Sequence, residues 1–153
     1  MIKSLLEVIN LGALPARHSV SVAGVIVDDN GRALLSRRRD NRSWEPPGGV
    51  LELSESIEDG LRREVREETG LAVEPVALTG VYKNMARGII ALVFRCRILE
   101  GQLTVNDEVT EFQWATADEV TRMVSEAHAV RVLDALYDNA TPAIRQHDGV
   151  HLV

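Results

Sequence analysis

The segment from Gly49 to Leu71 constrains the fold more than any other part of the 153-residue chain. It follows Pro46-Pro47-Gly48, whose fixed and permissive backbone angles favour an irregular loop. Ser56 is a suitable N-cap, and Gly70 suits the left-handed residue that ends a helix. The pattern therefore predicts a loop that leads into a helix over residues 57–69.

This predicted helix places acidic side chains beside its buried face. At about 100° per residue, Ile57 and Val65 fall about 40° to either side of Leu61, so these three define an apolar stripe. Acidic residues on a helix usually form a solvated face. Here Glu64 and Glu68 lie against the stripe instead, at a spacing where like charges repel. The pattern therefore favours a bound cation.

Three carboxylates, Glu64, Glu67 and Glu68, come from adjoining turns and can surround a hard divalent ion. Mg²⁺ accepts carboxylate, water and phosphate oxygens, and Mn²⁺ can substitute for it because it prefers similar oxygen donors. Such an ion polarises a phosphoryl group and lowers the pKa of a bound water. The residues therefore predict metal-assisted hydrolysis of a phosphoanhydride.

The same segment resembles the Nudix box. Gly49 is followed after five residues by Glu55, and seven further residues lead to the pair Arg63-Glu64. Glu67-Glu68 and Gly70 with an apolar neighbour complete the pattern, and every fixed position is present. Similarity to Nudix hydrolases implies an α/β/α sandwich with a mixed β-sheet and a catalytic loop-helix motif.

The resemblance also implies which residues bind the metal. Glu64, Glu67 and Glu68 would supply carboxylate oxygens, and the region of Gly48 or Gly49 would supply a backbone oxygen. Hydrolysis would then occur where these five residues meet.

Further residues would support or extend this site. Arg63 and Glu55 would orient the carboxylates through charge-assisted hydrogen bonds, with Glu52 as a further support. Arg63 as a solvated helix residue is the alternative. In similar enzymes, a loop acid before the strand that carries Trp114 is a metal ligand or a general base. Glu108 occupies that position, although a solvated loop acid is an equal alternative.

Candidate substrate contacts lie before the box. Arg37 and Arg38 could bind phosphate oxygens, or they could be a charged strand edge. Trp44 could stack on a nucleobase, or it could fill the core. Tyr82 is expected in the core, and the four histidines are expected at the surface or in satisfied positions.

Subgroup signatures narrow the substrate only slightly. Relatives that cleave ADP-ribose tend to carry a proline where Met85 and Ala86 stand, and those that cleave diadenosine polyphosphates tend to carry a tyrosine near Arg87 and Gly88. Elimination slightly favours a nucleoside triphosphate, oxidised ones included. ADP-ribose and nucleotide sugars stay open as substrates, and a non-catalytic ligand-binding module is the less favoured alternative because the carboxylates are intact.

The rest of the chain is predicted to belong to the same single domain, 1–153, with 1–14 and 141–153 as peripheral extensions. Residues 18–35 are typical of a β-hairpin with a turn at Asp28-Asp29-Asn30-Gly31. The apolar N-terminal segment could pack in a homodimer. Other expected elements are strands over 73–83, 89–99 and 111–115, and one helix from Thr116, as N-cap, to about 137.

Composition excludes several partners. The formal net charge of −6 argues against binding to a nucleic acid polymer, which leaves a small-molecule nucleotide as the expected partner. The N-terminal apolar run contains polar residues and is short, so no membrane span is expected. The single cysteine, Cys96, cannot form an intramolecular disulfide, and a cytoplasmic location is therefore expected.

Overall fold

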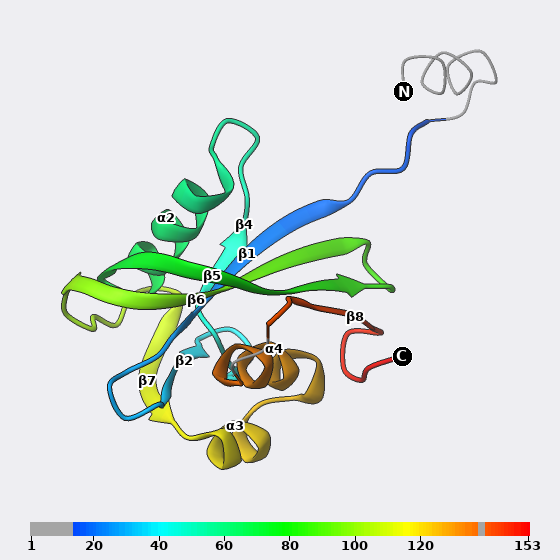
Figure 1. Cartoon of the computed structure of the whole chain (residues 1–153). Coiled ribbons are helices and arrows are strands. Elements are labelled where there is room, and N and C mark those ends of the chain that lie inside the picture. Colours follow the sequence, from blue (N-terminus) through cyan, green and yellow to red (C-terminus); the bar gives the residue numbers. More distant parts are fainter. Residues whose placement is uncertain (1–13, 138–139) are drawn as a thin grey trace.

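The computed structural model describes residues 14–137 and 140–153. In this part of the chain, four strands precede the first helix, three strands follow it, and two helices then precede the last strand (Figure 1). The strands are β1 (Ser19–Ile26), β2 (Ala33–Arg38), β3 (Trp44–Glu45), β4 (Gly48–Val50), β5 (Leu71–Asn84), β6 (Ile89–Gly101), β7 (Val109–Ala115) and β8 (Ala143–His147), and the helices are α2 (Ile57–Thr69), α3 (Ala117–Met123) and α4 (Glu126–Leu136).

The strands form two sheets. A five-stranded sheet has the order β4-β1-β6-β5-β8, and a three-stranded sheet has the order β3-β2-β7. The larger sheet is mixed, because β1 pairs with β6 in parallel and with β4 in antiparallel orientation. Helix α2 lies on one side of this sheet and α4 on the other (Figure 1). The predicted α/β/α fold with a mixed sheet is therefore confirmed.

Strand β1 explains why helices cover both faces. Successive side chains of a strand point to opposite faces. Val22 and Ile26 belong to the apolar cluster that includes Leu61 and Val65 of α2. Ala23 and Val25 belong to the cluster on the α4 side, and the members of both clusters are almost fully buried. The near-continuous apolar sequence of β1 is thus the sequence of a central strand.

Helix α2 begins and ends where its sequence predicts. The Ser56 hydroxyl accepts a hydrogen bond from the Asp59 amide at 3.2 Å, and Gly70 ends the helix with φ of 82°. Leu61 and Val65 are fully buried, but Ile57 is 43% exposed, so its place in the buried stripe was wrong. The first turn faces the loop before the helix rather than the sheet, as the tight approach of Gly60 to Leu51 indicates.

The predicted hairpin between β1 and β2 was also wrong. The Asp28 carboxylate does bind the Asn30 and Arg32 amides, as turn chemistry predicts. The two strands nevertheless enter different sheets, and only one isolated bridge, Val27 to Ala33, joins this region. Strand β2 pairs with β7 instead, so a long-range pairing overrides the local one.

The single helix predicted from Thr116 to residue 137 is two helices. Thr116 and Glu119 form the expected capping box at the start of α3. Val124 then adopts extended angles, φ −114° and ψ 139°, and Ser125 is the extended N-cap residue of α4. Val124 is only 6% exposed, so the break lets its side chain pack into the core.

The C-terminal segment is more closely integrated than a peripheral extension. Strand β8 pairs in parallel with β5, and the His147 side chain is 1% exposed. Arg145 forms two hydrogen bonds to Asp134, which also accepts one from the buried Tyr82 hydroxyl at 2.7 Å. This network joins α4 to both strands, and Tyr82 lies in the core as predicted.

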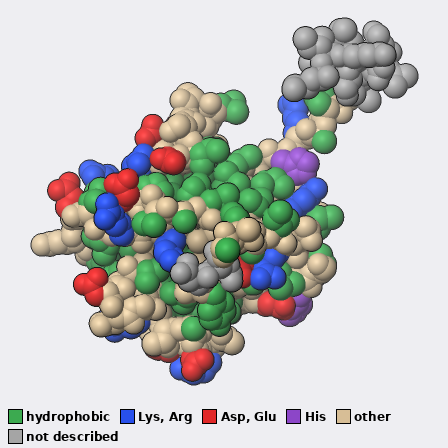
Figure 2. Space-filling model, viewed as in Figure 1, with side chains coloured by type: hydrophobic (Ala, Val, Ile, Leu, Met, Phe, Trp, Pro, Cys, Tyr) green, Lys and Arg blue, Asp and Glu red, His purple; other side chains and the backbone are tan. Residues whose placement is uncertain are grey.

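Hydrophobic side chains also gather on the surface over the five-stranded sheet (Figure 2). Val76 and Leu78 on β5 and Ile98 and Leu99 on β6 are exposed. Residues 1–13, which carry most of the segment on which a homodimer was predicted, lie outside the described residues. None of the described helices is long and apolar enough to cross a membrane.

Gly70 allows a stability test with a matched control. A Cβ at Gly70 would lie 2.5 Å from the Gln102 carbonyl oxygen, whereas one at Gly31, with φ of 74°, would meet nothing within 4 Å. Backbone strain should lower the free energy of unfolding of Gly31→Ala by about 1 kcal/mol, and the added clash should raise the loss in Gly70→Ala to about 2–3 kcal/mol. Urea unfolding measures both values, and equal losses would contradict the close approach.

Candidate active site

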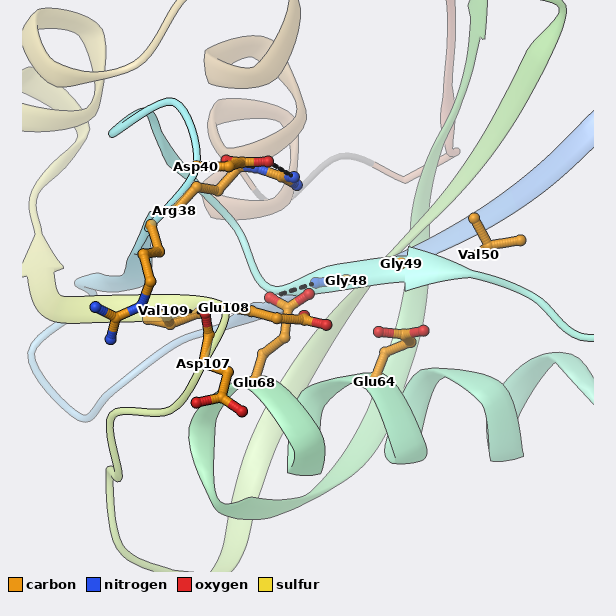
Figure 3. Close-up of a pocket in the computed structure, with 11 residues that line it drawn as sticks. Arg38, Asp40, Gly48, Gly49, Val50, Glu64, Glu68, Asp107, Glu108 and Val109 are labelled. Atoms are coloured by element: carbon orange, nitrogen blue, oxygen red, sulfur yellow. Dashed lines mark hydrogen bonds and ion pairs between the residues drawn. The ribbon is translucent and has the colours of Figure 1, made fainter.

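A cavity of about 570 Å³ lies between the start of β4, one face of α2, the end of β2 and the loop before β7 (Figure 3). Carboxylates and arginines dominate its wall. The lining residues are Arg38, Arg39, Asp40, Gly48, Gly49, Val50, Glu64, Glu68, Asp107, Glu108 and Val109.

Glu64 and Glu68 stand one turn apart on α2, and both carboxylates point toward β4 (Figure 3). The Gly48 amide donates a hydrogen bond to Glu68 Oε2 at 3.4 Å. A Cβ at Gly49 would overlap the Glu64 carboxylate, and one at Gly48 would overlap the Val22 carbonyl oxygen. Glycine at position 49 thus lets β4 approach the helix carboxylates, and glycine at position 48 lets β4 lie close to β1.

Enclosure raises the pKa values of these carboxyl groups. Burial is the main cause of the rise in the pKa of Glu68 from its usual 4.5 to about 8, and the charges of Glu64 and Glu108 add to it. Burial also raises the pKa of Glu64, although Arg63 opposes that effect. Near neutral pH, the cavity therefore requires protons or a cation to offset the crowded negative charge.

Arg63 connects the helix to the preceding loop. Its Nε donates to Glu55 Oε2 at 2.9 Å, and its Nη2 donates to Glu55 Oε1 at 2.6 Å. Its Nη1 donates to Glu64 at 2.9 Å and to Glu67 at 3.3 Å. The Arg63 guanidinium holds the pKa of Glu55 down at about 2, so the Glu55 carboxylate stays ionised. Arg63 thus fixes the carboxylates rather than extending into solvent.

Other predicted residues lie farther from the centre. The Glu67 side chain is 58% exposed and does not line the cavity. Glu52 contacts Arg63 only at 4.0 Å and is 63% exposed, although its amide donates to Glu55.

The donor atoms of the cavity wall suit a hard cation, although the side chains are not arranged around a metal position. Within residues 14–137 and 140–153, no three His, Cys, Asp or Glu side chains are arranged to hold a metal ion. The available donors are nevertheless carboxylate and backbone oxygens around the buried Glu68. Oxygen donors with negative charge are those that Mg²⁺ and Mn²⁺ prefer. The residues therefore fit a divalent cation.

Two residues that the sequence analysis missed hold the loop that carries Glu108. Asn106 Nδ2 donates to the Glu68 carbonyl oxygen at 2.7 Å, and Asn106 Oδ1 accepts from the Glu108 amide at 2.9 Å. Arg39 donates to the carbonyl oxygens of Asp107 and Asn106 at 3.1 and 2.9 Å. The Asn-Asp-Glu sequence is typical of an Asx-turn and could have indicated Asn106, but no local signal indicates Arg39.

Of the predicted substrate contacts, one lines the cavity and two lie outside it. Arg38 lines the cavity, where it pairs with Asp40 at 2.6 Å and Glu45 at 3.1 Å (Figure 3). Arg37 pairs with Glu111 at 2.6 Å, and its guanidinium lies 5.7 Å from the centre of the half-buried Trp44 ring. Neither Arg37 nor Trp44 lines this cavity.

Several known proteins are similar to this chain in sequence. The model of the NUDIX domain matches residues 17–136. A MutT-like protein of Streptomyces ambofaciens is 56% identical over 139 residues, covering 91% of this chain and 90% of the relative. An ADP-ribose pyrophosphatase of Methanocaldococcus jannaschii is 34% identical, covering 63% and 60%, and the nucleoside triphosphatase NudI of Salmonella agona is 31% identical, covering 62% and 80%.

Solved structures agree on the fold. An ADP-ribose pyrophosphatase of Streptococcus suis has a TM-score of 0.72 at 22% identity, covering 84% of this chain and 99% of that one. A UDP-X diphosphatase has a TM-score of 0.73 at 22% identity, covering 94% and 75%. The domain match, the S. ambofaciens relative and the complete box agree, so the chain belongs to the Nudix family and is a Nudix hydrolase, an enzyme that acts on pyrophosphate bonds.

Proposed function

We propose that this enzyme cleaves a pyrophosphate bond in a nucleoside diphosphate joined to a further group X, with Mg²⁺ as its cofactor and Mn²⁺ as a substitute. One observation carries the proposal: the Glu64 and Glu68 carboxylates converge on the Gly48–Gly49 strand. Arg63 pairs with Glu64, but no basic side chain among the described residues pairs with Glu68. A divalent ion bound there supplies charge neutralisation, polarises the phosphoryl group and acidifies a bound water.

The site residues have distinct roles in this proposal. Glu64 and Glu68 hold the cation, with a backbone oxygen from Gly48 or Gly49. Glu67 would complete the carboxylate set from the same helix, where Arg63 contacts both Glu64 and Glu67. The ionised Glu55 keeps Arg63 in place, and Glu52 supports Glu55 through its amide.

Glu108 is proposed as the general base. It lines the same cavity as Glu64 and Glu68, and its charge acts on both of their pKa values. Its loop backbone is fixed by the Asn106 and Arg39 hydrogen bonds, which hold Glu108 at the cavity wall. From there it can accept the proton of the attacking water, while Arg38 and Arg39 face the phosphate groups.

A nucleoside triphosphate, oxidised ones included, is the slightly preferred substrate. The similarity to NudI supports it, whereas the similarity to the M. jannaschii ADP-ribose pyrophosphatase supports ADP-ribose or a nucleotide sugar as the second candidate. A panel of nucleotides with Mg²⁺, followed by chromatography of the products, tests the choice. Nucleoside monophosphate with pyrophosphate would support the triphosphate, AMP with ribose phosphate would select ADP-ribose, and no turnover would favour a ligand-binding module.

Glu67→Gln and Glu68→Gln should each lower turnover by about two orders of magnitude or more, because each removes a negative charge from the metal site without removing volume. Steady-state kinetics at saturating Mg²⁺ measure the loss. Glu58→Gln is the matched control, since Glu58 is an exposed acid on the same helix that pairs only with Arg62 among the described residues. Wild-type turnover by either test variant would refute its role as a metal ligand.

Metal-free protein should become less stable as the pH rises from about 6.5 to 8. The range begins at about 6.5 because at lower pH the lowered pKa values of His128 and His147 act in the opposite direction. The folded state keeps the Glu68 proton over that range, because its pKa is raised, whereas the unfolded state has already lost it. The melting temperature should therefore fall with pH in chelator, and Mg²⁺ should raise it most at pH 8. A melting temperature that changes with neither pH nor Mg²⁺ would contradict the proposed crowding of carboxylates.

Glu108→Gln and Glu64→Gln should separate the base from the metal ligand. Loss of a general base lowers turnover by about 10² to 10⁴-fold, so Glu108→Gln should do this with little change in the Mg²⁺ concentration required. Glu64→Gln should raise that concentration as well. Titration of activity with Mg²⁺ distinguishes the two, and a silent Glu108→Gln beside an impaired Asp107→Asn or Glu111→Gln would move the base to a neighbouring acid.

A further inference from the structure

A second cavity, of about 540 Å³, is lined in part by β3. Consecutive residues of the loop before β3 line the two cavities, with Asp40 on the first and Asn41 on the second. Val50 of β4 pairs with Ser21 of β1, and Val50 lines the first cavity whereas Ser21 lines the second. The inner wall of the second cavity carries side chains from α4 and β8, including Arg131, His128 and His147.

Arg131 is a half-buried cation with one buried, unused donor. Its Nε is buried and has no hydrogen-bond partner among the described residues. No carboxylate in this part of the chain forms an ion pair with it, and its guanidinium lies 5.5 Å from the centre of the Tyr82 ring. Burial lowers the pKa of Arg131, since its charge is poorly solvated. An unpaired half-buried guanidinium is costly unless an acceptor reaches it.

His147 adds a third donor to the same place. Its Nδ1 lies 3.0 Å from the Gly149 amide, which can only donate, so Nδ1 carries no proton. A neutral His147 ring must therefore carry its proton on Nε2, and burial lowers the pKa of His147, which favours the neutral form. Nε2 lies 3.2 Å from Arg131 Nη2, which is also a donor. Two N–H groups thus face each other, and an acceptor that both can reach would relieve the conflict.

The acids of this cavity are engaged elsewhere. Glu45 pairs with Arg38 and contacts His128 Nε2 at 3.4 Å. Asp148 accepts hydrogen bonds from the amides of Val150 and His151 at 2.9 and 2.8 Å. Arg87, a second arginine of the wall, is exposed and forms no ion pair among the described residues. Neither acid pairs with Arg131, so its guanidinium has no ion-pair partner among the described residues.

We infer that the second cavity binds an anionic group, a phosphate or a carboxylate, through Arg131 and His147. Oxygens of such a group accept from Arg131 Nε, Arg131 Nη2 and His147 Nε2 together, which removes the conflict between the donors and pairs the half-buried charge. The anion has two sources. It is part of a nucleotide whose diphosphate lies in the first cavity, a reading that rests on the proposed function, or it is a separate small anion.

Nuclear magnetic resonance of the ¹⁵N-labelled protein tests the site without turnover. Inorganic phosphate, added in chelator so that no metal recruits it to the carboxylates, should shift the Arg131 Nε–H and His147 Nε2 signals. Arg131→Met should weaken phosphate binding about tenfold, while Arg131→Lys keeps the charge and retains part of it. Arg122→Met, at an exposed arginine of α3, is the matched control and should bind as the wild type does.

Two nucleotides then identify the source of the anion. ADP-ribose and its 2′-phosphate differ only by a phosphate outside the diphosphate. A shift of the Arg131 signal by the phosphorylated compound alone assigns the anion to the nucleotide, and a shift by inorganic phosphate alone assigns it to a separate anion. Arg131 and His147 signals that are shifted neither by millimolar inorganic phosphate nor by the phosphorylated nucleotide, or equal binding by wild type and Arg131→Met, would overturn the site. Neither result bears on cleavage in the first cavity.

Discussion

The repulsion between carboxylates enclosed by α2 and β4 is the constraint on which the rest of this structure depends. Glu68 is buried deeply enough to raise its pKa to about 8, and Glu64 faces Gly49 so closely that no larger residue fits. Such an arrangement opposes folding in the absence of a cation, because like charges are desolvated together. Packing elsewhere must hold the helix against the strand despite that repulsion.

That packing comes from both faces of the central sheet. Leu61 and Val65 fix the rotation of α2 about its axis, because both are fully buried against β1 and its neighbours. Rotation of α2 in turn determines that Glu64 and Glu68, rather than Arg62 or Arg66, face β4. Arg63 then joins the helix to the loop through Glu55, so the carboxylates are held by an ionised network as well as by the core.

Sequence predicted the parts of this arrangement that are local. The caps at Ser56 and Gly70 and the angular positions of Glu64 and Glu68 follow from residues close together in the chain, and the structure has them as predicted. Long-range pairing was not predictable in this way. The turn at Asp28 has the chemistry of a hairpin, yet β2 pairs with β7, and the burial of Val124 breaks a helix whose local pattern is continuous.

The second cavity could not be predicted for the same reason. Arg131 is an ordinary helix residue in the sequence, and His147 lies in a segment without a strong pattern. Only the pairing of β8 with β5 brings His147 beside Arg131, and only the turn at Gly149 sets which ring nitrogen carries the proton. The environment of His147 and Arg131 is therefore set by elements that are distant in the sequence.

The two cavities have opposite electrostatic requirements, and the residues between them keep these apart. Glu45 is the carboxylate that could neutralise Arg131, since its charge acts on the Arg131 pKa, but Arg38 pairs with it at 3.1 Å. Arg38 also pairs with Asp40, so its single positive charge is shared between Asp40 of the first cavity and Glu45 of the second. The first cavity has more carboxylates than arginines, whereas in the second the Arg131 guanidinium has no ion-pair partner among the described residues. A cation bound in one and an anionic group bound in the other would each relieve a local imbalance, and a nucleotide that spans both would place its charges where each is compensated.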